Sequence, residues 1–177
     1  AYETVQRTPD SITMRATMAN GLVVERTMTL PASSDVLQVK LSVHNPTSGP
    51  IEPRVKLHPE FFTQDLTTPE VWGFDGTVWK QLNTAPAAKD KAYGSRSAPG
   101  SYTRWAVYLP KAKVSIVNGF DPAHVGAMQY FYNTNETGRH VNLELVMPTA
   151  PLAPNETRVM EASYSVARKS PAKLGGK

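Results

Sequence analysis

The sequence predicts an all-β fold, an antiparallel sandwich of two sheets. Fifteen prolines and eleven glycines interrupt the 177 residues, and runs of alternating apolar and polar residues recur between them. No long apolar pattern has the 3.6-residue period of a helix. With 40% hydrophobic and 19% charged residues, the composition is that of a globular protein. A single domain is expected at 1–167, followed by a flexible basic tail at 168–177.

The first half of the chain is expected to hold four strands. Asn20-Gly21 is typical of a two-residue turn, so the first two strands are expected to form a hairpin. Pro53 lies inside the fourth strand and indicates an edge position or a bulge. In each strand apolar residues recur at alternate positions, which puts them on one face of a sheet. The four ranges are 11–18, 22–30, 36–45 and 51–58.

The second half begins less regularly. A short strand is expected at 77–82, and residues 83–100 are rich in Ala, Pro, Lys and Gly, which predicts a long loop. The pattern of about ten strands, with no helix and no internal repeat, indicates antiparallel sheets packed face to face. Regular alternation resumes after the loop and predicts five further strands at 104–109, 114–118, 128–132, 140–147 and 157–166.

The formal net charge of +4 is not spread over the chain. Arg168, Lys169, Lys173 and Lys177 lie in the last ten residues, which contain no acidic residue, so the rest of the chain has 15 basic and 15 acidic side chains. A nucleic-acid-binding domain carries its basic excess on the folded body. The sequence therefore predicts no nucleic-acid partner.

Several classes of chemistry have no sequence signal. The absence of cysteine excludes thiol catalysis, cysteine zinc sites and disulfides. The four histidines lack metal-site spacing, and no nucleotide, NAD or serine-hydrolase motif occurs, so no metal and no cofactor are expected. No apolar run is long enough to cross a bilayer, so we expect no membrane partner. Ala1 opens directly into polar, strand-like sequence, so any signal peptide is expected to be absent or already removed. The compartment stays open, with a periplasmic or secreted location favoured over the cytoplasm.

Aromatic residues gather in the middle of the chain, where thirteen of the fifteen lie between Phe61 and Tyr132. Aromatic faces suit the apolar patches of sugar rings, and Tyr and Trp add a polar edge. Trp72, Trp105 and Tyr130 are therefore candidates for a carbohydrate site. The alternative is that these rings fill a wide core.

One histidine and one glutamate stand on the polar faces of two predicted strands. His58 continues the polar positions of its strand, which must end at Pro59. In 140–147, Asn142 and Glu144 alternate with apolar residues and point the other way. A histidine and a carboxylate are residue types that general acid–base catalysis uses. The alternative is that both are ordinary solvated side chains.

Five segments resemble the galactose mutarotase (aldose 1-epimerase) family. Residues 39–50 (VKLSVHNPTSGP) and 55–61 (VKLHPEF) are similar to its strand ending in Asn, its polar turn and the strand that leads to a His-Pro-aromatic-Phe motif. Residues 141–148 (VNLELVMP), 152–157 (LAPNET) and 162–166 (ASYSV) are similar to its Glu-bearing strand, Leu-x-Pro-Gly-Glu turn and final strand. The resemblance covers most of the chain after residue 22, and we expect the family's N-terminal part to be absent.

The resemblance implies a galactose mutarotase-like supersandwich whose polar sheet binds a carbohydrate. By motif position, His58 would be the general acid and Glu144 the general base of an epimerase that needs no cofactor. The substrate-binding candidates are Arg54, Trp72, Asp75, Trp105, Tyr130 and Asn142.

Two departures from the family pattern bear on activity. Glu60 stands where the motif usually has an aromatic residue, and Asn155 replaces the turn glycine, although Asn tolerates positive φ.

Three functions stay open. A non-catalytic or accessory carbohydrate-binding domain of a sugar-processing protein, with other domains as partners, is favoured over an aldose 1-epimerase and over a structural or protein-interaction sandwich.

Overall fold

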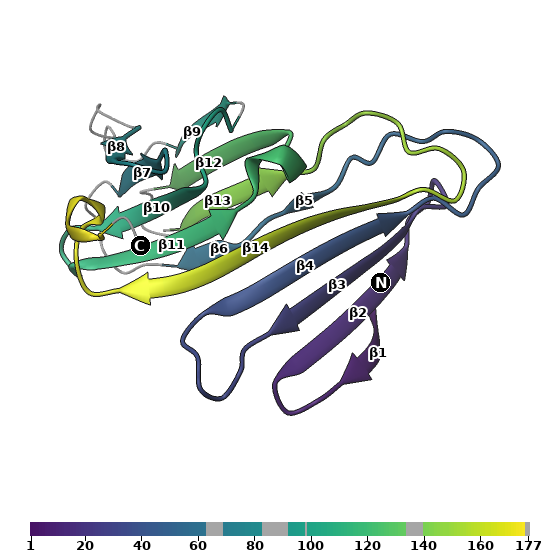
Figure 1. Cartoon of the computed structure of the whole chain (residues 1–177), viewed down its shortest axis with the longest axis horizontal. Helices are drawn as coiled ribbons and strands as arrows, with labels where there is room; N and C mark the ends of the chain where they lie inside the picture. Colours follow the sequence, from purple (N-terminus) through teal and green to yellow (C-terminus); the bar gives the residue numbers. More distant parts are fainter. Residues whose placement is uncertain (63–68, 83–91, 98, 134–139, 176–177) are drawn as a thin grey trace.

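The structure is a computed structural model that describes residues 1–62, 69–82, 92–97, 99–133 and 140–175. Its strands form two antiparallel sheets (Figure 1), which confirms the predicted all-β sandwich. The large sheet has nine strands, in the spatial order β1 (Glu3–Arg7), β2 (Ser11–Thr17), β3 (Val23–Thr29), β4 (Leu37–His44), β14 (Thr157–Ala167), β11 (Val114–Phe120), β10 (Arg104–Leu109), β7 (Glu70–Phe74) and β8 (Trp79–Gln81). The smaller sheet has five strands. In it β13 (His140–Val146) pairs with β5 (Lys56–Leu57), β6 (Glu60–Phe62) and β12 (Ala127–Asn133), and β12 pairs with β9 (Ala92–Ser97).

The predicted strand at 51–58 is wrong in its extent. Only Lys56–Leu57 joins a ladder, and Ile51 forms an isolated bridge with Leu152. Pro53 has no amide hydrogen to donate, so the ladder cannot run through it. The turn at Asn155 has a φ of 62°, the left-handed conformation that a glycine otherwise provides there.

Four strands were not given bounds from the sequence, namely β1, β6, β7 and β9, although the start of the chain was expected to be strand-like. The described part of the predicted loop at 83–100 contains β9. Two short 3₁₀ helices, η1 (Pro122–His124) and η2 (Pro171–Lys173), complete the regular structure of the described residues. Neither has the length and apolar character of a membrane-spanning helix.

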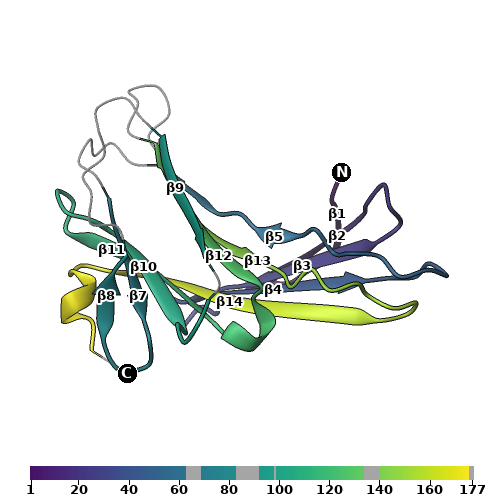
Figure 2. The ribbon, with the colours of Figure 1, turned by 90° about the horizontal axis from the view of Figure 1, so that it is seen from above.

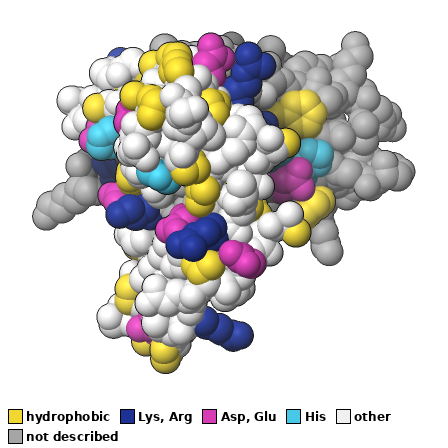
Figure 3. Space-filling model, turned by 90° about the vertical axis from the view of Figure 1, so that its right-hand side faces the viewer, with side chains coloured by type: hydrophobic (Ala, Val, Ile, Leu, Met, Phe, Trp, Pro, Cys, Tyr) yellow, Lys and Arg dark blue, Asp and Glu magenta, His cyan; other side chains and the backbone are white. Residues whose placement is uncertain are grey.

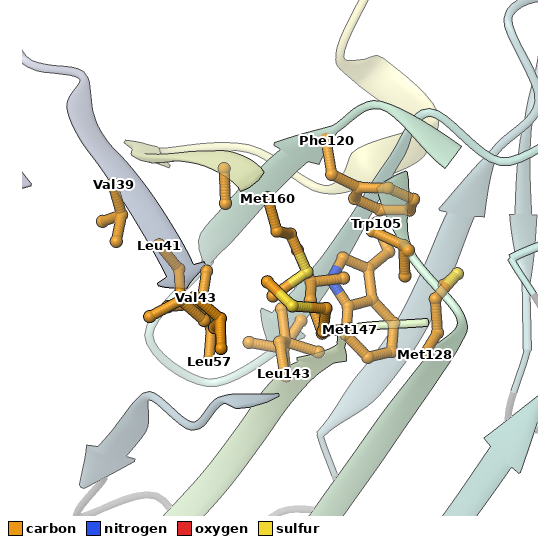
Figure 4. Packing of buried hydrophobic residues seen from close by; sticks show 14 of the residues in the cluster. Val39, Leu41, Val43, Leu57, Trp105, Phe120, Met128, Leu143, Met147 and Met160 are labelled. Carbon is orange, nitrogen blue, oxygen red and sulfur yellow. The ribbon is translucent and has the colours of Figure 1, made fainter. Parts of the chain in front are cut away.

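The core fills the space between the two sheets. Side chains of β4 and β13 that alternate inward belong to it, and so does Trp105 of β10, which is only 1% exposed. In Figure 4, Met147 and Met160 lie between the aliphatic side chains of β4 and the ring of Trp105. Asn118 accepts a hydrogen bond from the indole Nε1 at 2.6 Å, which satisfies the one polar atom of that ring.

A smaller apolar cluster lies on the opposite face of the large sheet. It consists of Phe74, Trp79 and Ala106, with Trp72 and Leu174 packed against it. Part of the predicted tail therefore contacts the body. In the same segment the side chain of Pro171 is buried, and the hydroxyl of Ser115 donates to the carbonyl of Lys169 at 2.7 Å.

One cation occupies an apolar position of the large sheet. Arg26 shares its face of β3 with Val24 and Met28, both of which belong to or pack against the core. Its guanidinium carbon lies 5.3 Å from the centre of the Tyr2 ring. Its Nε atom is buried and has no hydrogen-bond partner among the described residues.

The two outermost strands of the large sheet are irregular or short. The side chains of β1 are all exposed, and its register with β2 shifts between Thr4 and Gln6. At the other edge β8 has only three residues. Figure 1 shows β1 at the edge of the large sheet, beyond β2, and Figure 2 shows the N-terminus beside it.

The smaller sheet has an inner and an outer face. Alternate residues of β13 turn Leu143 and its neighbours toward the core, so the side chains of His140, Asn142 and Glu144 lie on the face turned away from the large sheet. We call this the outer face. The antiparallel register brings Gln129 of β12 opposite Glu144 on that face.

Candidate functional site

Three residues of the sequence motifs meet on the outer face of the smaller sheet: His58, Asn142 and Glu144. Asn142 and Glu144 are two residues apart on β13, so both point outward. His58 directly follows β5. Because Leu57 pairs with Leu145 in an antiparallel ladder, the next residue of the edge strand lies beside Glu144.

The three side chains form a hydrogen-bonded cluster. Nε2 of His58 lies 3.2 Å from Oε1 of Glu144 and 2.7 Å from Nδ2 of Asn142. Nδ2 of Asn142 also donates to Oε1 of Glu144 at 3.4 Å. A neutral ring with its proton on Nδ1 accepts from Asn142, whereas a ring that carries a proton on Nε2 donates to Glu144. The same ring nitrogen therefore serves either neighbour, according to its protonation.

A lysine compensates the buried carboxylate. Glu144 is 2% exposed, and its Oε2 accepts from Nζ of Lys56 at 2.6 Å. The Lys56 and His58 side chains are 41% and 40% exposed, so they form the solvent-facing part of the cluster. Glu60, also partly exposed, places Oε1 3.5 Å from Nε2 of His58. The outer surface of the site is thus polar and accessible, whereas its carboxylate lies beneath it.

Three rings continue this face beyond the polar cluster. Phe62 of β6 pairs with His140 of β13, and their ring centres are 6.1 Å apart. Phe131 of β12 lies opposite Asn142, and its ring centre is 5.6 Å from that of His140. Phe62 is 76% exposed. We call Phe62, Phe131 and His140 the aromatic row.

Sequence reasoning did not assign the aromatic row, although part of its signal is present. His140 stands at the same alternation as Asn142 and Glu144, and Phe62 stands at the same alternation as His58 and Glu60. The pairing of these two segments decides that the rings meet. That pairing is a long-range property of the sheet.

The aromatic candidates chosen from the sequence lie elsewhere. Trp105 is enclosed in the core and has no surface to offer a ligand. Trp72 packs on the opposite face of the large sheet, where its Nε1 donates to Glu70 at 3.0 Å. Tyr130 lies on the inner face of the smaller sheet, with its ring stacked 6.2 Å from that of Tyr132. The structure does not bring these three rings to the polar cluster.

Of the remaining two candidates, Arg54 adjoins the cluster and Asp75 lies apart from it. Arg54 is exposed and forms an ion pair with Glu52 at 3.3 Å. It lines a groove of about 480 Å³ together with Lys56 and Gln129, so it adjoins the site on the Lys56 side. Asp75 lies in the turn between β7 and β8, on the large sheet.

Asp75 has local partners that explain its place in the turn. Nζ of Lys80 lies 2.8 Å from its Oδ2, and the backbone amides of Thr77 and Val78 donate to its Oδ1. These contacts, led by Lys80, lower the pKa of Asp75 to about 2. The same pair raises the pKa of Lys80. Asp75 therefore stabilises a turn.

Charges of both signs are interspersed over the surface. On the side of the molecule seen in Figure 3, basic, acidic and histidine side chains alternate with hydrophobic ones, without a stripe of one sign. Among the described residues no group of three or more His, Asp or Glu side chains is arranged to hold a metal ion.

No protein-family model and no curated protein matches the chain. Solved structures match its fold. A proposed aldose 1-epimerase from Escherichia coli K12 has a TM-score of 0.66 at 18% identity, covering 94% of this chain and 68% of that one. A galactose mutarotase-like protein from Lactobacillus casei ATCC 334 has a TM-score of 0.68 at 10% identity, covering 94% and 73%. An α-galactosidase from Geobacillus stearothermophilus has a TM-score of 0.57 at 15% identity, covering 95% and 26%.

The chain spans from 25% to 73% of the length of such structures, so the fold recurs both as most of a protein and as one part of a larger one. At these identities the likeness concerns the fold and not the activity. It agrees with the resemblance in the sequence motifs around His58 and Glu144. The chain therefore has the fold of the galactose mutarotase-like proteins.

Proposed function

We propose that this domain binds carbohydrate on the outer face of the smaller sheet. The observation that carries the proposal is the combination on one face of an exposed His58, supported by buried polar side chains, with the aromatic row. Sugar hydroxyls pair with imidazole, amide and carboxylate groups, and the apolar faces of sugar rings pack on aromatic rings. Proteins of this fold named as a proposed aldose 1-epimerase and an α-galactosidase support a sugar ligand.

The burial of Glu144 favours binding over turnover. Both carboxylate oxygens already have partners, Lys56 on one and His58 with Asn142 on the other. A ligand on the surface meets Lys56, His58 and Glu60 first. Glu144 then acts on the ligand through the orientation of the histidine ring.

The test is titration of the protein with a panel of aldoses, followed by NMR chemical shifts or calorimetry. His58→Ala should abolish saturable binding, because it removes the exposed ring that Asn142 and Glu144 hold in place. His44→Ala is the matched control, since this histidine lies on the large sheet and bonds Thr157. Failure of every sugar to bind would overturn the proposal and favour a structural or protein-interaction sandwich.

A second candidate is an aldose 1-epimerase, favoured by the 3.2 Å contact between His58 and Glu144. In ring opening, Glu144 takes the proton of the anomeric hydroxyl, His58 gives a proton to the ring oxygen, and the bond between that oxygen and the anomeric carbon breaks as a carbonyl forms. Rotation and closure reverse these transfers. The ring oxygen and the anomeric hydroxyl oxygen are bonded to the same carbon. The acid that protonates one and the base that deprotonates the other must therefore be neighbours.

This candidate requires Lys56 to release the carboxylate. Polarimetry on a freshly dissolved α-anomer distinguishes the two functions. Acceleration above the buffer rate that both His58→Ala and Glu144→Gln abolish would establish the epimerase. Sugar binding without acceleration would leave the binding domain.

A further inference from the structure

The outer face continues well past the polar cluster. On β13, His140 is four residues from Glu144, which corresponds to about 13 Å along an extended strand. On the neighbouring edge segment, Phe62 is likewise four residues from His58. The polar cluster and the aromatic row are therefore two parts of one strip of surface, longer than a single sugar ring.

The edge of this strip changes from polar to aromatic along its length. Lys56, His58, Glu60 and Phe62 follow one another at every second position, and all four lie on the outer face. The side chain of Glu60 is 46% exposed and stands between the histidine and the exposed ring. Charged and hydrogen-bonding groups thus occupy one end of the strip and aromatic rings the other, and a chain of sugar units matches this with the hydroxyl groups of one unit and the apolar ring face of another.

The exposure of the Phe62 ring favours a ligand that has both apolar and hydrogen-bonding surfaces. A large aromatic side chain at 76% exposure contributes little to the core, and it lies next to two further rings on the same face. A purely apolar partner on Phe62 would leave the neighbouring Glu60 desolvated, which is unfavourable. A carbohydrate supplies hydrogen-bonding groups to this carboxylate.

We infer that the ligand is an oligosaccharide, with one sugar unit at His58 and another stacked on Phe62 of the aromatic row. This inference rests on the proposed carbohydrate binding and extends it to the length of the ligand. Each further unit that reaches the aromatic row adds contact area, so affinity increases with chain length until the strip is filled.

The experiment is calorimetric titration with glucose, galactose, lactose, and the maltose and cellobiose series up to the tetrasaccharide. The wild-type protein should bind the best trisaccharide about tenfold more tightly than its monosaccharide, the gain expected from covering one aromatic face. Phe62→Ala should remove that gain, so that this variant binds the trisaccharide and the monosaccharide with affinities within about twofold of each other. Phe62→Trp should restore it.

Tyr2→Ala serves as the control, because Tyr2 is also an exposed ring but lies beyond β1 on the large sheet. Phe62 is exposed, so its replacement should leave the circular dichroism unchanged. Affinity independent of chain length, or a length dependence that persists in Phe62→Ala, overturns the inference and leaves monosaccharide binding intact. Absence of binding by every sugar overturns the proposed function together with this inference.

Discussion

The buried carboxylate of Glu144 depends on Lys56, and Lys56→Met removes the charge while keeping the length of the stem. Breaking a fully buried ion pair costs 3–5 kcal/mol, as an order of magnitude, and breaking an exposed pair costs up to about 1 kcal/mol. This pair is intermediate, because Glu144 is 2% exposed and the Lys56 side chain 41%. We expect a loss of about 2 kcal/mol in the free energy of unfolding, which lowers Tm by about 6 °C for a chain of this size.

Urea unfolding at neutral pH measures the loss, and a second substitution tests its cause. If the loss comes from an uncompensated buried charge, Lys56→Met combined with Glu144→Gln should regain most of it, because the charge is gone. Arg54→Met, which breaks the exposed pair with Glu52, should change stability by less than about 0.5 kcal/mol. An unchanged midpoint in Lys56→Met, or a double variant no more stable than the single one, would show that Lys56 does not compensate the charge of Glu144.

Three further predictions concern stability. Arg26→Met should raise the free energy of unfolding by about 1 kcal/mol in urea titrations, because it removes a buried, unpartnered Nε atom from an apolar face. The pKa of Asp75 is lowered by Lys80 to about 2, so its stabilising effect is complete above the unfolded pKa near 4 and is lost as the pH falls toward 2; Asp75→Asn should flatten the fall in stability over that window. Gly126→Ala should lower stability by about 2 kcal/mol in thermal unfolding, since the added Cβ would lie 2.8 Å from the backbone Cα of Pro148.

Each of these has a matched control. Arg15→Met breaks an exposed pair with Glu25 and should not raise stability. If Arg15→Met raised the free energy of unfolding as much as Arg26→Met, loss of charge alone would explain the gain in Arg26→Met. Equal acid sensitivity of wild type and Asp75→Asn would contradict the role of that carboxylate. Gly49→Ala places its Cβ in open space, and a loss as large as that of Gly126→Ala would show that steric contact is not the cause.

The polar half of the site follows from local sequence. Alternation alone puts His58 on the same side as Lys56 and Glu60, and Asn142 on the same side as Glu144, because side chains of a strand point to opposite faces in turn. The similarity of the two motifs to one family then indicates that they meet.

The aromatic half of the site does not follow from local sequence. Whether a ring such as Tyr130 or Phe131 faces the core depends on which side of β12 the large sheet covers, and composition does not specify this. Trp105 illustrates the same limit, because a tryptophan that fills the core and one that binds a sugar have the same local pattern. Likewise Pro53 predicted a bulge or an edge position, but it did not predict that only two residues of this segment would pair in a ladder.

The irregular edge of the large sheet bears on how copies of this chain behave at high concentration. An edge strand offers unpaired amide and carbonyl groups on which a second chain can add a strand, and fibrils grow in that way. The register shift between Thr4 and Gln6 breaks this template in the middle of β1, and β8 is too short to extend one. Both ends of the nine-stranded sheet thus resist the edge-to-edge growth that a long flat strand would invite.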